Sequence, residues 1–194
     1  YFDLFDYISQ HFLVMPPTIR DGMPNLYGGL FALLMLPVFF LTRRIPLRSK
    51  LLHFGLLLTL IVSFNINALN FFWHGFHYPN QLPFRNSFVY IFLLLSMAYP
   101  AWKSLPELTG KQIGSLAALF MGLALLAQKL NDKPLPMPAL YATIIFLALY
   151  AAVLTWGRVQ AVHPADLAIA LLLVMLSELS VNTLVVMHKV DITE

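Results

Sequence analysis

The chain contains no cysteine and few charged residues. The absence of cysteine excludes disulfide bonds, thiol nucleophiles and cysteine-based metal sites. Only 11% of the 194 residues are charged, whereas soluble domains carry about a quarter. The excess of Lys and Arg is small, 12 against 9 acidic residues, and is scattered along the chain. Because no basic patch is formed, no nucleic-acid partner is expected.

Long apolar runs take the place of charge: 59% of the residues are hydrophobic and the mean hydropathy is +0.75. A helix needs about 20 mostly apolar residues to cross the roughly 30 Å hydrocarbon core of a bilayer. The runs are too long for strands and do not alternate. The sequence therefore predicts an all-α integral membrane protein with about six transmembrane helices joined by short loops. The expected spans are residues 26–41, 51–69, 88–102, 113–130, 139–156 and 167–186.

Basic residues in the loops predict an orientation. Residues 42–50 carry four positive charges, which favours the cytoplasmic side. If the spans alternate, residues 103–111 and 157–164 lie on that side, and both termini and residues 70–87 face outward. The chain is expected to be an internal fragment of a longer protein. Its expected parts are an extracytoplasmic loop remnant over residues 1–24, a six-helix membrane region over 25–187 and the start of an extracytoplasmic segment over 188–194.

The outward segment 70–87 holds six aromatic residues, two histidines and one arginine. Trp73 has the amphipathic ring that favours a membrane interface, but it can equally shape a pocket. Arg85 is either a side chain that reaches lipid phosphates or a fixed partner for a substrate phosphate. His74 and His77 have the spacing of a divalent-metal pair, but His-x-x-His alone is a weak motif. No cofactor is assigned on this evidence.

Two polar patterns lie within the expected spans. Glu178 is the one acid well inside a span, and Asn182 follows it one helical turn later. Such residues either join helices through hydrogen bonds or take part in a substrate site. Ser63, Asn67 and Asn70 are spaced as a second polar stripe along one helix, with the same two interpretations.

Several motifs resemble one family of bacterial membrane proteins, the YfhO family. Phe84 stands where that family is expected to have Tyr, and His77 where it is expected to have an amide or another polar residue. The resemblance covers most of the chain and is most specific in the outward segment. The motifs that carry it are NFFWHGF at residues 70–76, PN at 79–80, PFR at 83–85, SF at 87–88, NLYGGL at 25–30 and ELSVN at 178–182.

The resemblance implies a fragment of a GT-C type glycosyltransferase membrane module in a bacterial cell membrane. Such enzymes transfer a sugar from an undecaprenyl-phosphate donor to a cell-surface polymer, here expected to be lipoteichoic acid. Their catalytic acid lies in an earlier outward loop, so no catalytic residue is expected in this fragment, which should be inactive alone. The expected substrate-binding residues are Trp73, His74, His77, Asn80 and Arg85.

Two other functions remain open on the sequence. The first is a transporter or flippase for a lipid-linked envelope precursor, which would place its polar groups near the bilayer midplane. The densest polar cluster here lies in the outward segment, which favours an enzyme acting at the membrane surface. The second is a membrane scaffold without a ligand, which leaves the polar aromatic segment unexplained. Membrane lipid is an expected partner in each case.

Overall fold

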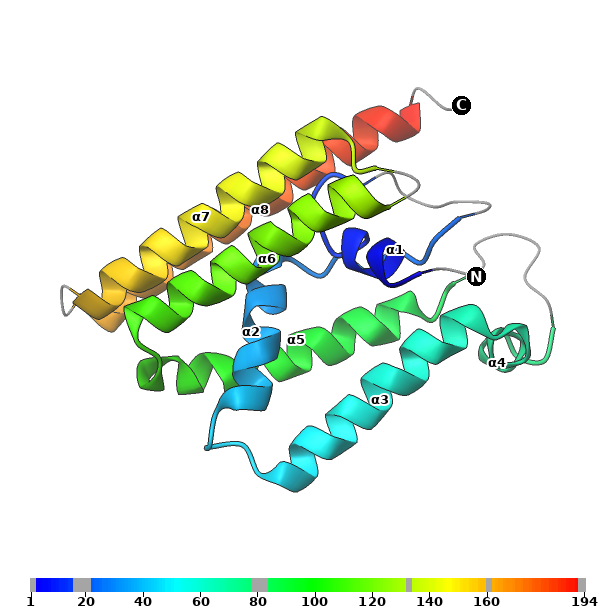
Figure 1. Ribbon diagram of the computed structural model, residues 1–194, viewed down its shortest axis with the longest axis horizontal. Helices are drawn as coiled ribbons and strands as arrows, with labels where there is room; N and C mark the ends of the chain where they lie inside the picture. The colour runs from blue at the N-terminus through cyan, green and yellow to red at the C-terminus, as the bar shows by residue number, and fades with distance from the viewer. Residues whose placement is uncertain (1–2, 16–21, 78–83, 132–133, 160–161, 192–194) are drawn as a thin grey trace.

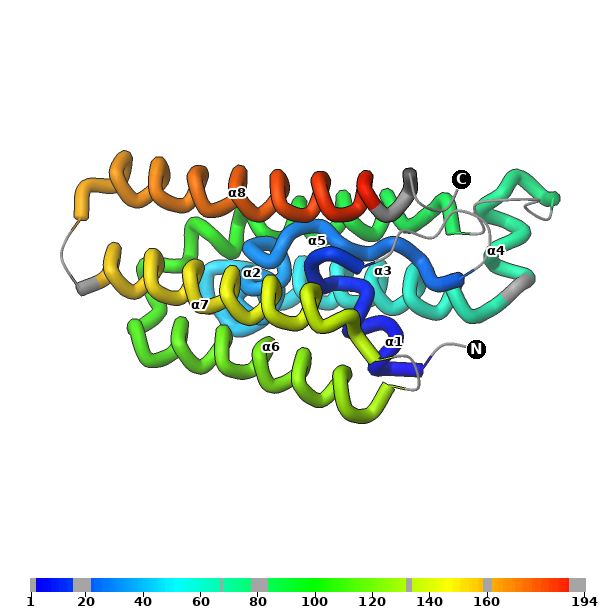
Figure 2. Tube along the Cα trace, turned by 90° about the horizontal axis from the view of Figure 1, so that it is seen from above, coloured from blue at the N-terminus to red at the C-terminus, as the bar shows by residue number. Residues whose placement is uncertain are grey.

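The computed structural model describes residues 3–15, 22–77, 84–131, 134–159 and 162–191, and within these ranges it is helical and contains no strand. Figure 1 shows the arrangement of the helices, and Figure 2 shows it from above. The elements are α1 (Leu4–Ser9), α2 (Leu30–Leu41), α3 (Leu47–Asn65), α4 (Asn67–Trp73), α5 (Ser87–Ser104), the 3-10 turn η1 (Leu105–Glu107), α6 (Gly110–Leu130), α7 (Met137–Val159) and α8 (Pro164–Asp191).

Five helices in the described part of the chain are long and apolar enough to cross a membrane: α3, α5, α6, α7 and α8. The prediction of an all-α membrane protein is therefore confirmed. The sixth apolar run forms α2, which has 12 residues and a length of about 18 Å. That is shorter than the roughly 30 Å hydrocarbon core. In Figure 1, α2 lies across the direction of the long helices.

The start of α2 differs from the sequence prediction. The helix begins at Leu30 and not at Leu26, which is fully buried in an extended stretch before it. Gly29 has φ of +94°, a conformation that side chains with a Cβ disfavour, and it is the N-cap of α2. The first four residues of the predicted span, 26–29, therefore lie before the helix, which begins after them.

The predicted span 51–69 is interrupted. α3 ends at Asn65 and α4 begins at Asn67, because Ile66 leaves the helical region with φ of −108° and ψ of 108°. The expected stripe of Ser63, Asn67 and Asn70 therefore does not follow one continuous helix. Ser63 is buried, and its hydroxyl accepts a hydrogen bond from the Asn86 amide at 3.2 Å. The break turns α4 away from the axis of α3 (Figure 1).

The N-terminal segment is part of the packed structure. A capping box between Asp3 and Asp6 starts α1, and Phe12, Leu13 and Val14 that follow it are no more than 1% exposed. The segment packs against α6 through α1. The expectation that residues 1–24 face outward stays a prediction, but Tyr7 and residues 12–14 belong to the core.

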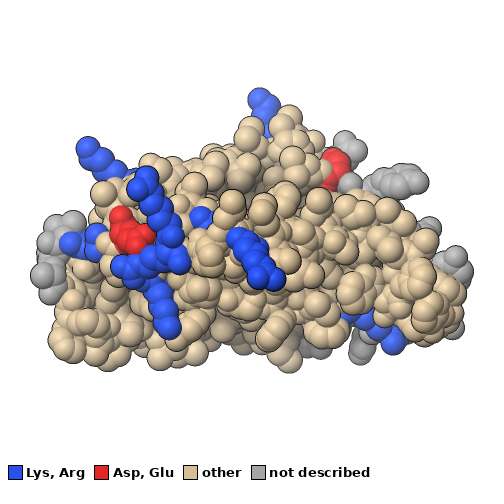
Figure 3. Space-filling view, turned by 90° about the horizontal axis from the view of Figure 1, so that it is seen from below, with Lys and Arg blue, Asp and Glu red and all other residues tan. Residues whose placement is uncertain are grey.

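The loops separate into two ends. Loops 42–50 and 103–111 touch, because Thr42 donates to Glu107 at 3.0 Å and the Arg44 guanidinium pairs with Glu107 and donates to the Lys103 carbonyl at 3.0 Å. Together with the described residues of loop 157–164 they form the basic end of the molecule, at the left of Figure 1, and basic side chains gather there in Figure 3. α4 and the C-terminal end of α8 lie at the other end, called here the aromatic end.

Candidate functional site

The aromatic end carries most of the residues expected to bind substrate. His74 is 6% exposed, whereas Trp73 is 45% exposed and both His77 and Arg85 are exposed. Trp73 ends α4, and Arg85 lies two residues before α5. Asn80 lies outside the described residues. The structure therefore places one buried histidine among exposed aromatic and basic side chains.

The protonation pattern of His74 follows from its contacts. Its Nδ1 lies 2.8 Å from the carbonyl oxygen of Asn70, and a carbonyl only accepts, so Nδ1 carries the proton. In the neutral ring Nε2 is then an acceptor, and this buried atom has no hydrogen-bond partner in the described part of the chain. The His77 ring stands almost perpendicular to the His74 ring, with 6.4 Å between their centroids.

The side-chain oxygens of Asn70 and Asn86 are likewise buried and unpaired within the described ranges, as is that of Gln128 near the end of α6. Asn70 lies one helical turn before His74 on α4. Buried polar atoms in folded proteins are nearly always hydrogen-bonded. Acceptors that lack donors are suited to hydroxyl groups, from water or from a carbohydrate.

A metal site is not completed by the described residues. They contain no group of three or more His, Cys, Asp or Glu side chains close enough to hold an ion. His74 and His77 supply two ligands at most, fewer than a stable zinc site uses.

The second polar centre is Glu178, which lies inside the molecule and is 1% exposed. Its Oε1 accepts from the Tyr27 hydroxyl at 2.6 Å and from the Leu30 amide at 2.7 Å, and its Oε2 accepts from the Tyr150 hydroxyl. Leu30 is the first residue of α2, so the carboxylate sits at the positive end of that helix dipole. Asn182, one turn along α8, accepts from the Val14 amide at 2.8 Å.

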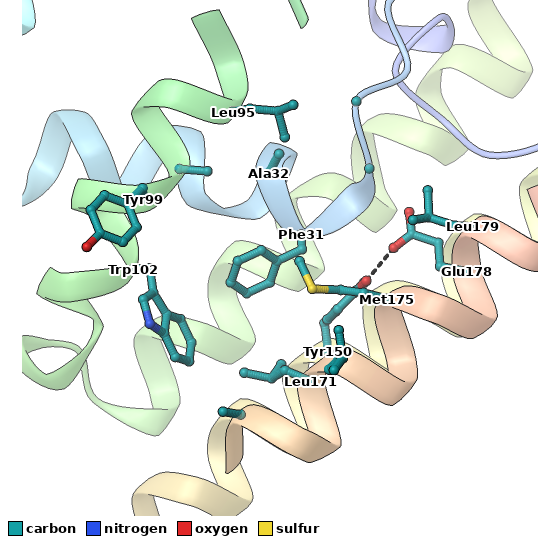
Figure 4. A pocket seen from close by; sticks show the side chains of 15 residues that line it. Phe31, Ala32, Leu95, Tyr99, Trp102, Tyr150, Leu171, Met175, Glu178 and Leu179 are labelled. Atoms are coloured by element: carbon teal, nitrogen blue, oxygen red, sulfur yellow. Dashed lines mark hydrogen bonds between the residues drawn. The ribbon is translucent and has the colours of Figure 1, made fainter. Parts of the chain in front are cut away.

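Glu178 also borders a cavity of about 550 Å³ between α5 and α8 (Figure 4). α2 and Tyr150 of α7 form its floor, and α8 packs mainly on α7. Apart from Glu178 and the tyrosine and tryptophan polar atoms, its lining is apolar. Glu178 lies on α8 inside the molecule, whereas Asn70, His74 and Asn86 lie in or next to α4 and α5, so these are two separate candidate sites.

The sequence analysis did not identify the partners of these residues. Tyr27 and Tyr150 resemble ordinary interface or core tyrosines, and only the fold brings them to Glu178. His11 was also missed: its Nδ1 donates to the Tyr7 carbonyl at 2.7 Å and its Nε2 accepts from the Tyr90 hydroxyl at 2.9 Å. Burial lowers the pKa of His11 to about 4, so the ring is neutral at neutral pH and can accept that bond.

The fold defines a multi-pass, all-α membrane protein with polar groups at one end and a buried carboxylate in its interior. The family model described as bacterial membrane protein YfhO matches residues 2–193, nearly the whole chain. The chain therefore belongs to the YfhO family, as its motifs indicated. No curated protein and no solved structure matches it.

Proposed function

We propose that this chain is the membrane part of a glycosyltransferase. The enzyme takes a sugar from an undecaprenyl-phosphate donor and adds it to a cell-surface polymer such as lipoteichoic acid. Membership of the YfhO family, which is associated with glycosyltransferase-like membrane function, supports the class. The observation that carries the proposal is the set of buried, unpaired acceptors of Asn70, His74 and Asn86 at the end where Arg85 is exposed.

The unpaired acceptors suit the sugar of such a donor, and Arg85 suits its phosphate. Sugar hydroxyls are donors, and they match acceptors that have no donor of their own. During transfer the bond between the anomeric carbon and the phosphate oxygen breaks, and its electron pair leaves with the polyprenyl phosphate. Arg85 would stabilise the charge that grows on that phosphate, with a planar fork that matches phosphate oxygens. The acceptor's hydroxyl oxygen forms the new bond to the anomeric carbon, and its proton goes to the carboxylate expected in an earlier outward loop.

The same proposal fixes the orientation. The aromatic end faces outward from a bacterial cell membrane, because the basic end carries the positive charges that favour the cytoplasmic side. The donor's lipid then lies in the outer leaflet, with its phosphate at the level of Arg85. Trp73 and His77 are exposed beside the buried His74 and would border the sugar.

A transporter or flippase of a lipid-linked precursor is the second candidate. The observation that favours it is α2, a short helix whose N-terminus lies inside the molecule, as in transporters whose broken helices bind anions. Here that N-terminus already has Glu178 as its anion, and both carboxylate oxygens are used. Because Glu178 already occupies the N-terminus of α2, the glycosyltransferase is favoured over the transporter. The same contacts are compatible with a membrane scaffold.

The deciding experiment is Arg85→Lys in the full-length protein. Lys keeps the charge but cannot form two parallel hydrogen bonds to phosphate. Sugar transfer from a polyprenyl-phosphate donor is expected to fall by at least about tenfold, which is roughly 1.4 kcal/mol of transition-state stabilisation. Protein level in the membrane should stay unchanged, since one interfacial cation replaces another.

The matched control is Arg48→Lys, an exposed arginine at the basic end, which should transfer sugar at the wild-type rate. If Arg85→Lys also transfers at the wild-type rate, Arg85 does not bind the donor phosphate. If the wild-type protein transfers no sugar and instead moves the intact lipid-linked precursor across vesicles, the transporter is correct.

A further inference from the structure

The cavity between α5 and α8 lies far from Arg85. Its lining on α5 runs from Leu95 to Trp102, in the half of the helix nearest the basic end. Leu95 and Trp102 are 10 and 17 residues from Arg85, which is roughly 15 and 26 Å along a helix. On α8 the lining runs from Ala168 to Leu179, again from near the basic end toward the middle. A donor whose phosphate binds Arg85 therefore has its headgroup in the other leaflet.

The dimensions of the cavity fit a hydrocarbon chain. Leu179 follows Ala168 by eleven positions, which is roughly 17 Å along α8. The groove therefore offers an apolar strip of that length, along which an extended acyl chain can lie.

The chemistry of the lining fits the same occupant. Phe31, Ala98, Leu171 and Met175 offer aliphatic and aromatic surface without charge, and Figure 4 shows labelled side chains of α5 and α8 on opposite sides of Phe31. Glu178 closes the deep end, and its oxygens already bind three donors of the protein. A ligand in this groove consequently meets apolar surface along its length and no free polar partner at its tip.

The mouth of the groove is positively charged. The Lys103 ammonium lies 4.5 Å from the ring centroid of Tyr99, which lines the groove. Lys103 has no ion pair in the described part of the chain, where Arg44 pairs with Glu107 instead. The acids of this end are Glu107 and Asp166, against Lys and Arg at seven positions: 43, 44, 48, 50, 103, 111 and 158.

We propose that this groove binds one acyl chain of an anionic glycerophospholipid from the leaflet at the basic end, with Lys103 contacting its phosphate. The lipid would fill the space that α5 and α8 leave between them and so hold α8 against the rest of the bundle. The site is separate from the proposed sugar-donor site in position and in leaflet. It does not depend on sugar transfer.

Native mass spectrometry on the full-length protein tests this. The protein is exchanged into micelles that contain equal amounts of phosphatidylglycerol and phosphatidylcholine, and the lipids that stay bound are counted. Ala168 is an exposed residue of the lining, so Ala168→Trp fills the groove. Bound phosphatidylglycerol is expected to fall at least about tenfold. Ala152→Trp, on an exposed position of α7 outside the lining, should keep wild-type binding.

Lys103→Gln gives a second test that leaves the groove unfilled. Lys103 is exposed, and a cation near an anionic lipid surface favours binding, so the preference for phosphatidylglycerol over phosphatidylcholine should fall about fivefold. The proposal is overturned if Ala168→Trp binds as much phosphatidylglycerol as Ala152→Trp. It is equally overturned if Lys103→Gln keeps the wild-type preference, if the wild type retains no phospholipid, or if polyprenyl phosphate is retained in its place. Arg85→Lys should bind phosphatidylglycerol normally, which separates this result from the donor site.

Discussion

Glu178 accepts three hydrogen bonds, and the donors belong to different parts of the chain. Tyr27 precedes α2, Leu30 begins it, and Tyr150 lies on α7. A carboxylate only accepts, so three converging donors match its chemistry. Its position at the N-terminus of α2 adds a favourable interaction with the helix dipole. Glu178 therefore joins α8 to α2 and α7 without needing a ligand.

Substitution of Glu178 should separate this structural role from a catalytic one. Glu178→Ala leaves two buried donors and one part-buried donor unpaired, at about 1–3 kcal/mol for each buried one, so the melting temperature in detergent should fall strongly. Glu178→Gln keeps one acceptor oxygen, and the Tyr150 hydroxyl can turn to accept from the amide. That variant should lose only about 1 kcal/mol and keep its activity in the full-length protein.

The control for Glu178 is Ser177→Ala, at an exposed position whose hydroxyl bonds only to its own helix at Val174. It should melt close to the wild type. If Glu178→Ala melts at the same temperature as Ser177→Ala, the three hydrogen bonds contribute little to stability. Normal melting with lost activity in Glu178→Gln would place the charge in the substrate path.

At this scale the sequence predicted that Glu178 bonds across helices or serves a site, and the structure gives it a full set of helix-joining bonds. It did not predict the partners, because Tyr27 and Leu30 are 151 and 148 residues away. The substrate-binding roles of Trp73, His74, His77, Asn80 and Arg85 stay predictions. The unpaired acceptors beside His74 also required the fold, since burial cannot be deduced from a polar, aromatic segment.

At the scale of elements, α2 depends on Gly29. A side chain at φ of +94° is strained, and its Cβ would lie 4.0 Å from the Glu178 carboxylate. Gly29→Ala is expected to lower the free energy of unfolding by about 1–2 kcal/mol, because alanine disfavours this backbone conformation. Differential scanning calorimetry of the protein in detergent measures the change in melting temperature.

The matched control for Gly29 is Gly55→Ala in α3, where a new Cβ meets nothing within 4 Å. Alanine favours a helix interior over glycine by roughly 0.5–1 kcal/mol, so this variant should melt at or above the wild-type temperature. Equal melting of the two variants would mean that the entry to α2 is not constrained by Gly29.

The apolar runs predicted the long helices well, because five of the six predicted runs each contribute one membrane-length helix in the described part of the chain. α2 and the α3–α4 break were not predicted. In both cases an apolar run continues through a residue that leaves the helix, Gly29 or Ile66, and hydropathy does not register that change. The sequence also did not predict the packing of residues 12–14, because their partners Thr143 and Asn182 lie far along the chain.

For the whole molecule, the two ends make the orientation testable. The chain has no cysteine, so single cysteines can be introduced without background. In cells, Asn80→Cys should react with a membrane-impermeant thiol reagent, and Pro46→Cys should stay unlabelled until the membrane is opened. The physical reason is the positive charge of loop 42–50, which favours the cytoplasmic side. The opposite labelling pattern would reverse the orientation and move the proposed donor to the inner leaflet.

The bond between Leu30 and Glu178 also sets an order for biosynthesis. The two residues are 148 positions apart, and at about 5–20 residues per second a ribosome needs roughly 7–30 s to make the intervening chain. Throughout that interval the first amide of α2 has been made but its carboxylate partner has not. A nascent chain that stops before α8 leaves that helix end unpaired in an apolar environment. A helix translated later therefore decides when α2 is complete.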